Sequence, residues 1–155
     1  MTGYTRFLAM ISTSTLTMYG LMYLNTFSLD HVYFSETRAY MALYMGAVMA
    51  IVMLAFMWGM YKNTAANVGI ILVSALVFAA SLFLVRSQKP ITDVAWMKAM
   101  IPHHSIAILT SSRANISDPR VQTLANEIIE AQRREIDEMQ RLNADLEGQT
   151  TPPDE

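Results

Sequence analysis

The sequence predicts an all-α protein, with three transmembrane helices followed by a long helical hairpin. Residues 1–89 hold three uncharged apolar stretches of roughly 21 to 23 residues, each long enough to cross a hydrocarbon core of about 30 Å. Beyond residue 90 the apolar residues recur every three or four positions, which is the period of an amphipathic helix. We therefore expect a transmembrane region over residues 1–89, a hairpin over residues 90–147 and a disordered tail over residues 148–155.

The transmembrane region divides into predicted spans at about residues 7–27, 39–61 and 65–85. The first span contains the run STSTLT at residues 12–17, which lowers its hydrophobicity. A cleaved signal peptide is the other interpretation of this stretch, but no A-x-A-like cleavage site follows its apolar core. We therefore expect three retained spans, which make the lipid bilayer a partner of the chain.

Three spans would also place all the histidines on one side of the membrane. An odd number of spans puts the loop 28–37 on the same side as the C-terminal hairpin. The chain has three histidines, His31, His103 and His104, and they would share that side. The basic residues are divided almost evenly between the two sides, so charge alone does not fix the orientation.

Charge and composition exclude several classes of function. Residues 1–89 hold five Lys/Arg and two Asp/Glu, a net charge of +3, and residues 90–155 hold six and eleven, a net charge of −5. The acidic C-terminal part argues against nucleic-acid binding and mildly favours cations. The chain has no cysteine, which excludes disulfides, thiolate zinc sites and iron–sulfur clusters.

The chain contains 13 methionines, and those of the second span recur mostly four residues apart. This spacing places them on one stripe of a helix. Two interpretations stay open: an adaptable packing seam between helices, or a ladder of thioether ligands for Cu(I). The methionines of the stripe are Met41, Met45, Met49, Met53, Met57 and Met60.

The hairpin is predicted from its caps as well as from its periodicity. Thr92 is suited to cap a helix over residues 93–113. Asp118 followed by Pro119 is a typical start of a second helix, which we expect over about residues 119–146.

Polar side chains lie on the faces of this hairpin that should be buried. Gln132 and Glu135 interrupt the apolar stripe of the second helix, and a buried carboxylate is costly unless it is paired or bound to a metal. On the first helix two methionines and two histidines share one sector of about 120°. Antiparallel folding brings this sector level with Gln132 and Glu135. The four residues are Met97, Met100, His103 and His104.

This combination of side chains predicts a metal site. Thioethers, imidazoles and one carboxylate suit copper, above all Cu(I), better than zinc or calcium. Each residue also has an ordinary structural explanation as a core or surface side chain. The predicted ligands are His103, His104, Met100 and Met97, then Glu135 and Met139, with His31 added because of the predicted topology.

Residues 92–146 resemble the domain-of-unknown-function family 305. The family pattern is an M-x-x-M-I-P-H-H helix, followed by a helix reading D-P-x-V…L-A-x-x-I-I-x-A-Q-x-x-E-I-x-x-M. The stretch LMYLNTFSLDHVYFSETR resembles the membrane-anchored branch of that family. The matching residues include Met97, Met100, Ile101, Pro102, His103, His104, Asp118, Pro119, Val121, Leu124, Ala125, Gln132, Glu135, Ile136 and Met139.

The resemblance implies a ferritin-like helical fold, copper binding or resistance in some members, and a periplasmic hairpin anchored to a bacterial inner membrane. This chain differs in two ways. It has Ser105-Ile106 where many members carry Gln-Gly, and one hairpin where many members hold two. One hairpin cannot bury both sides of its seam, so we expect a homodimer or larger homo-oligomer that completes a four-helix bundle.

The sequence therefore predicts a membrane-anchored metal-binding protein, acting in Cu(I) sequestration, tolerance or delivery. The alternative is a structural membrane oligomer, in which the His, Gln and Glu side chains fix helix packing instead of binding metal. An enzyme is not expected, because the Glu-x-x-His pairs of di-iron bundles and Gly-rich phosphate loops are absent from the sequence.

Overall fold

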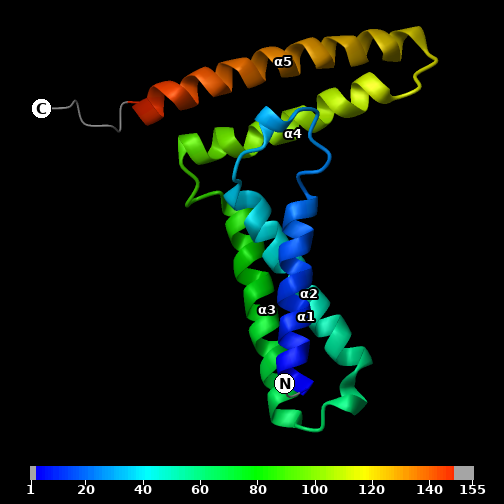
Figure 1. Ribbon diagram of the computed structural model, residues 1–155, viewed down its shortest axis with the longest axis vertical. Coiled ribbons are helices and arrows are strands. Elements are labelled where there is room, and N and C mark those ends of the chain that lie inside the picture. Colours follow the sequence, from blue (N-terminus) through cyan, green and yellow to red (C-terminus); the bar gives the residue numbers. More distant parts are fainter. Residues whose placement is uncertain (1–2, 149–155) are drawn as a thin grey trace, which may run out of the picture. The chain divides into compact units, whose positions relative to one another are not determined.

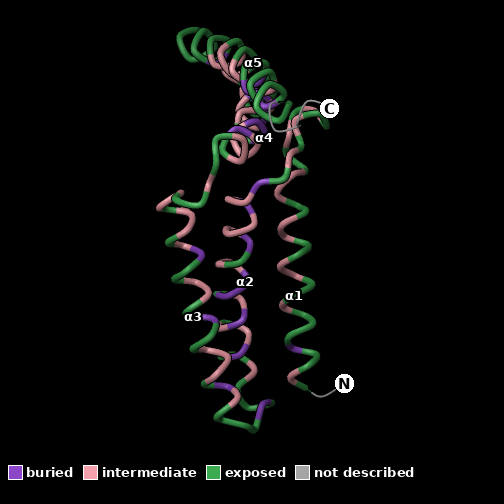
Figure 2. Tube along the Cα trace, turned by 90° about the vertical axis from the view of Figure 1, so that its left-hand side faces the viewer, coloured by how far each residue is buried: buried purple, intermediate pink, exposed green. Residues whose placement is uncertain are grey.

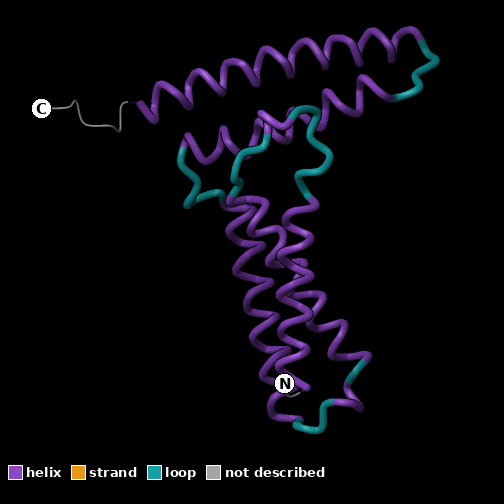
Figure 3. Tube along the Cα trace, viewed as in Figure 1, coloured by secondary structure: helices purple, strands orange, loops and turns teal. Residues whose placement is uncertain are grey.

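The computed structural model describes residues 3–148. Within this range the chain is all-helical, as the sequence predicts, and contains no strand (Figure 3). Residues 149–155, which make up most of the predicted tail, lie outside the described residues. The α-helices are α1 (Gly3–Leu21), α2 (Glu36–Phe56), α3 (Thr64–Ser87), α4 (Asp93–Arg113) and α5 (Pro119–Gly148), with short 3-10 helices at Leu29–His31 and Trp58–Met60 (Figure 1).

The described residues divide into two compact units. The apolar unit consists of residues 3–22 and 37–90 and holds α1, α2 and α3. The hairpin unit consists of residues 23–36 and 91–148 and holds α4 and α5. The loop 23–36 belongs to the hairpin unit although it joins two helices of the apolar unit.

Two helices, rather than the predicted three, are long and apolar enough to cross a membrane. Among the described residues these are α2 and α3, which correspond to the predicted spans 39–61 and 65–85. The prediction for residues 7–27 is wrong in this respect. α1 is a helix of 19 residues, but the hydroxyl side chains at residues 12–17 make it too polar, and it ends at Leu21 instead of continuing to residue 27.

α2 buries a face made mainly of small side chains (Figure 2). A Cβ atom on Gly46 would lie 3.1 Å from the Thr15 Cγ2 on α1, and still closer to the Thr15 hydroxyl. The two helices therefore approach each other closely at this point, which small residues permit. Besides Arg38 in its first turn, the buried residues of α2 are Ala42, Gly46, Ala47, Ala50 and Leu54.

The methionines of the predicted stripe are not the centre of this face. Met41, Met45, Met49 and Met53 are half-buried, and Met53 packs against the cluster that contains Phe7 and Leu54. Such contacts are what a flexible thioether provides as packing material. Metal binding by the stripe stays a prediction.

α4 and α5 run antiparallel and enclose the core of the hairpin unit (Figure 1). Lys98 pairs with Glu147 near one end of α4, and His104 pairs with Glu135 farther along it. The buried apolar side chains of the two helices form one cluster. Its buried residues are Met97, Ile101, Ile108, Ile136 and Met139.

Both hairpin helices begin at the predicted caps. The Ala95 N–H donates to the Thr92 hydroxyl at 3.3 Å, and the Arg120 N–H donates to the Asp118 carboxylate at 2.8 Å. These side chains satisfy N–H groups that a helix start leaves without partners. α4 also continues through Pro102 as one helix.

The loop 23–36 contacts α4 at the buried Ser105 hydroxyl. The Phe27 N–H donates to the Ser105 Oγ at 2.7 Å, and the His31 Nδ1 lies 2.9 Å from the same atom. Farther along the loop, the Gln140 amide of α5 donates to the Tyr33 hydroxyl at 3.4 Å. The loop therefore contacts both helices of the hairpin.

Candidate metal centre

His104 and Glu135 form the centre of the candidate site. The antiparallel pairing of α4 and α5 brings the His104 Nε2 within 2.8 Å of the Glu135 Oε2. The other ring nitrogen, Nδ1, lies 3.0 Å from the backbone carbonyl oxygen of Met100, one turn earlier in α4. The imidazole is therefore held at both nitrogens and cannot rotate without losing a contact.

These contacts assign a role to each nitrogen. A carbonyl oxygen only accepts hydrogen bonds. Nδ1 therefore carries a proton and donates a hydrogen bond to the Met100 carbonyl. This leaves Nε2 to face the Glu135 carboxylate oxygen Oε2. Histidines that bind metals usually have their second nitrogen fixed in this way, by a carbonyl or carboxylate.

The site lies at the edge of the hairpin core. The His104 side chain is 13% exposed and the Glu135 side chain 46% exposed. Gln132, one turn before Glu135, donates from its amide to the same Glu135 oxygen at 3.4 Å. The imidazole is thus largely shielded from water, whereas the carboxylate remains accessible to an ion from solvent.

The other predicted ligands on α4 differ in their placement. His103 is exposed, and its ring centroid lies 6.3 Å from that of His104. Successive helix residues point about 100° apart, so His103 turns away from Glu135. Met100 is half-buried and packs against the hairpin core, and its backbone carbonyl contacts His104.

Met97 and Met139 lie in the hydrophobic core of the hairpin. Their exposed fractions are 5% and 7%, and they belong to one cluster with Ile101 and Ile136. The structure therefore places these two thioethers among apolar side chains, where methionine is ordinary core material. Their role as copper ligands stays a prediction.

His31 reaches α4 next to the candidate site through Ser105. Its Nε2 lies 3.8 Å from the Asp30 carboxylate, and the Ser28 hydroxyl, which donates to that carboxylate, holds the pKa of Asp30 below its usual value. The sequence identified His31 only by topology and treated Ser105 only as a departure from the family pattern. No local pattern in the sequence indicated the contact between these two residues.

One chain supplies two neighbouring donor atoms here, which is only part of a metal site. The part of the chain that the structure describes holds no cluster of three or more His, Asp or Glu side chains that could bind a metal. A tetrahedral ion would hold Nε2 and Oε2 about 3.3 Å apart, compared with 2.8 Å here. An opening of about half an ångström therefore admits an ion, and further donors must come from His103, Met100, Gln132, water or a second chain.

The family comparison concerns the hairpin. The structure defines a class of all-α proteins. Its members would have two apolar helices and a helical hairpin that carries a His–Glu pair. Residues 84–155 match the family described as "Domain of unknown function (DUF305)", which supports the predicted resemblance of this part of the chain.

One curated protein is similar to part of the chain. An uncharacterized protein of Acanthamoeba polyphaga mimivirus is 34% identical over 74 residues, which is 46% of this chain and 49% of the viral protein. The chain thus aligns with about half the length of the curated relative that it matches. No solved structure matches the chain. Neither the family description nor this relative states a function.

Proposed function

We propose that this protein is a membrane-anchored metal-binding protein that holds copper at His104 and Glu135, for sequestration or delivery of the ion. One observation carries the proposal: the His104 Nδ1 is fixed by the Met100 carbonyl, while its Nε2 faces the Glu135 carboxylate at 2.8 Å. This arrangement presents one imidazole nitrogen and one carboxylate oxygen to an ion. His103 and Met100 are the nearest further donors in the sequence. The proposal assigns no catalysed reaction to the site.

The membrane anchor is proposed from the apolar unit. α2 and α3 have the length and composition of membrane-spanning helices, and residues 1–22 and 37–90 contain no Asp or Glu. The anchor would lie in a bacterial cell membrane, with the hairpin unit on the periplasmic side, as the family resemblance implies.

Self-association is proposed from the surface of α5. This helix leaves large apolar side chains accessible, with Val121 48%, Leu124 54% and Leu142 45% exposed. Packing a second hairpin on this surface would complete a four-helix bundle and remove these side chains from water. A second chain could then supply donors that a single hairpin lacks.

The decisive test is a copper competition titration on the full-length protein in detergent, with Cu(I), Cu(II) and Zn(II) as separate arms. We expect His104→Ala to lower the affinity for the preferred ion by at least about tenfold. His103→Ala should lower this affinity less. Glu138→Gln, an exposed carboxylate on α5, is the matched control for Glu135→Gln. Copper affinity that is unchanged in the His103→Ala/His104→Ala double variant would overturn the proposal.

A structural role is the second candidate function. The His104 ring already has a partner for each nitrogen without any metal, and such a pair can fix the register of a helical assembly. In that case His104→Ala would break the oligomer whether or not copper is present. Light scattering with and without copper separates the two functions, because loss of copper affinity with unchanged oligomer mass contradicts the structural role.

A further inference from the structure

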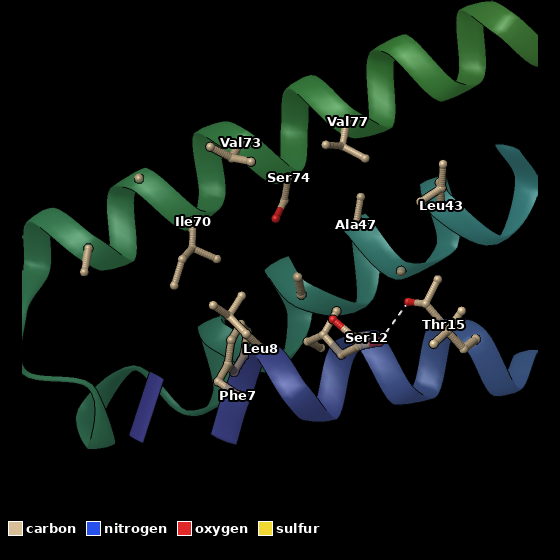
Figure 4. A pocket seen from close by; sticks show the side chains of 16 residues that line it. Phe7, Leu8, Ser12, Thr15, Leu43, Ala47, Ile70, Val73, Ser74 and Val77 are labelled. Atoms are coloured by element: carbon tan, nitrogen blue, oxygen red, sulfur yellow. Dashed lines mark hydrogen bonds between the residues drawn. The ribbon is translucent and has the colours of Figure 1, made fainter. Parts of the chain in front are cut away.

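The apolar unit contains a groove that its own side chains leave unfilled. The groove lies between α1 and α3, with α2 as its floor, and has a volume of about 650 Å³ (Figure 4). Its floor includes Gly46, Ala47 and Ala50, whose small side chains account for the space. Ile70 and Ser74 point from α3 towards α1 across the groove (Figure 4).

The lining of the groove suits a hydrocarbon chain. Its residues are aliphatic or aromatic except for Ser12, Thr15 and Ser74, and the Thr15 hydroxyl already donates to the Ile11 carbonyl at 2.8 Å. The groove follows α3 from Ala66 to Val77, a length of about 16 Å at about 1.5 Å per residue. In a bilayer, such a groove faces the acyl chains of the surrounding lipids.

Positive charge lies at one end of the groove. Arg6 directly precedes the lining residue Phe7, and Lys62 lies four residues before Ala66; both cations are exposed. Residues 1–22 and 37–90 contain five Lys/Arg and no Asp or Glu, so no carboxylate of the apolar unit neutralises this end.

We propose that the groove binds one acyl chain of an anionic phospholipid, whose phosphate contacts Arg6 and Lys62. The proposal rests on the membrane anchoring proposed above and is independent of copper binding. A phosphate placed between two exposed cations gains favourable Coulomb energy, and the acyl chain fills apolar space that would otherwise be unpacked.

Charge favours a lipid over a second copy of the chain as the occupant. Two copies in one membrane have the same orientation, so a symmetric contact along this groove would bring Arg6 and Lys62 of both copies to the same depth. Like charges placed together without a carboxylate between them oppose association. A zwitterionic lipid, for its part, supplies no net charge to balance the two cations.

The test is native mass spectrometry of the full-length protein purified from membranes in a nonionic detergent. Dioleoyl phosphatidylglycerol and dioleoyl phosphatidylcholine are added separately, and bound lipid is counted per chain. We expect one phosphatidylglycerol per chain, retained roughly 5- to 30-fold more tightly than phosphatidylcholine. Glycerol phosphate, which has the head group but no acyl chain, should not displace it.

Two kinds of variant separate the head-group contact from the groove. Arg6→Gln/Lys62→Gln should abolish the preference for phosphatidylglycerol, whereas Arg133→Gln/Arg134→Gln, which removes two exposed cations of α5, should retain it. Ala47→Leu should reduce binding of both lipids by filling the floor. Val73→Phe, on the exposed wall of the groove, should also reduce binding of both lipids. Because Val73 is exposed, this substitution disturbs folding less than Ala47→Leu does.

The outcomes also separate this inference from the proposed function. A protein that sits in the membrane fraction but shows no preference between the lipids overturns the lipid site and leaves the anchor intact. A protein that is absent from the membrane fraction overturns the anchor and the lipid site together. If Val73→Phe lowers the oligomer mass but leaves lipid retention unchanged, the groove is an interface between copies and the inference is wrong.

Discussion

The two units of this chain bury different kinds of side chain. In the hairpin unit the buried apolar residues are mainly large, such as Met97, Ile101 and Ile136. In the apolar unit the buried face of α2 is mainly small and lets α1 approach closely at Gly46, beside a cluster of the larger side chains Phe7, Leu54 and Tyr61. Water drives large apolar side chains together, whereas lipid provides no such force and helices associate through close packing of small residues. The small residues on the buried face of α2 therefore suit the proposed lipid environment, and the large core of the hairpin unit suits water.

Charge is divided along the same boundary. All 13 Asp and Glu residues of the chain lie in residues 23–36 and 91–155, and none lies in residues 1–22 or 37–90. The two tryptophans are divided as well, since Trp58 lies in the apolar unit and Trp96 in the hairpin unit. Variants that keep one tryptophan, Trp58→Phe or Trp96→Phe, therefore report the unfolding of each unit separately.

The largest effect is expected from truncating the hairpin core. Ile101 is fully buried in α4, so Ile101→Ala should lower the free energy of unfolding of the hairpin unit by about 2–5 kcal/mol, because it loses buried surface and leaves a cavity. The measurement is denaturant unfolding followed by Trp96 fluorescence in the Trp58→Phe background.

A graded control accompanies this change. Ile101→Val removes only one methylene group and should cost about 0.5–1.5 kcal/mol. The Trp58 signal of the apolar unit, followed in the Trp96→Phe background, should be unaffected by either variant. If Ile101→Ala shifts both signals equally, the units unfold as one, and the contrast between their cores has no independent energetic meaning.

The second prediction enlarges a buried residue of the apolar unit instead of truncating one in the hairpin unit. Gly46→Ala places a methyl group against Thr15, whose hydroxyl is held by the Ile11 carbonyl. Overpacking of this kind should cost about 1–3 kcal/mol and lower the melting temperature reported by Trp58. Gly69→Ala is the matched control, because a Cβ there meets no atom within 4 Å.

A double variant tests the named contact directly. Thr15→Ala removes the hydroxyl and methyl groups that the new side chain would meet, so Gly46→Ala/Thr15→Ala should recover most of the lost stability. If the double variant is as unstable as Gly46→Ala alone, close packing of α1 against α2 does not explain the small residues on this face.

Local signals in the sequence predicted the hairpin better than the first helix of the apolar unit. Caps at Thr92 and Asp118 depend only on neighbouring residues, so the observed start of each hairpin helix matches the prediction. For residues 7–27 the sequence indicated an apolar stretch, but the Ser and Thr side chains outweighed it and the helix ends at Leu21.

The sequence predicted which helix faces meet at the candidate site, but not which residues are in contact. Folding the hairpin about residue 116 was expected to place Met97 level with Glu135, whereas the structure pairs Glu135 with His104, about two turns farther along α4. Periodicity did not separate exposed His103 from half-buried His104, because both fell within the same broad sector. The contact of Ser105 with His31 joins residues 74 positions apart, and no local pattern in the sequence encodes it.

The smallest predicted effect uses the uneven distribution of carboxylates. The Arg120 side chain, which donates to Asp118, holds the pKa of that carboxyl below its usual value. A carboxyl with a lowered folded-state pKa stabilises the protein above its unfolded-state pKa and loses this contribution as pH falls through the folded-state value. Acidification should therefore loosen the start of α5, whereas the apolar unit, which has no carboxylate side chain, should show a nearly flat response.

Asp118→Asn separates the charge from the cap in this prediction. The asparagine side chain can still accept the Arg120 N–H at the helix start, but it has no proton to gain in acid. We expect the variant to have slightly lower stability near pH 7 and a shallower decline between about pH 5 and pH 2, followed through Trp96. If the stability of the variant declines as steeply as that of the unaltered protein, other carboxylates of the hairpin unit cause the acid sensitivity. If the Trp58 signal reports the same decline for the apolar unit, the charge boundary does not divide the pH response.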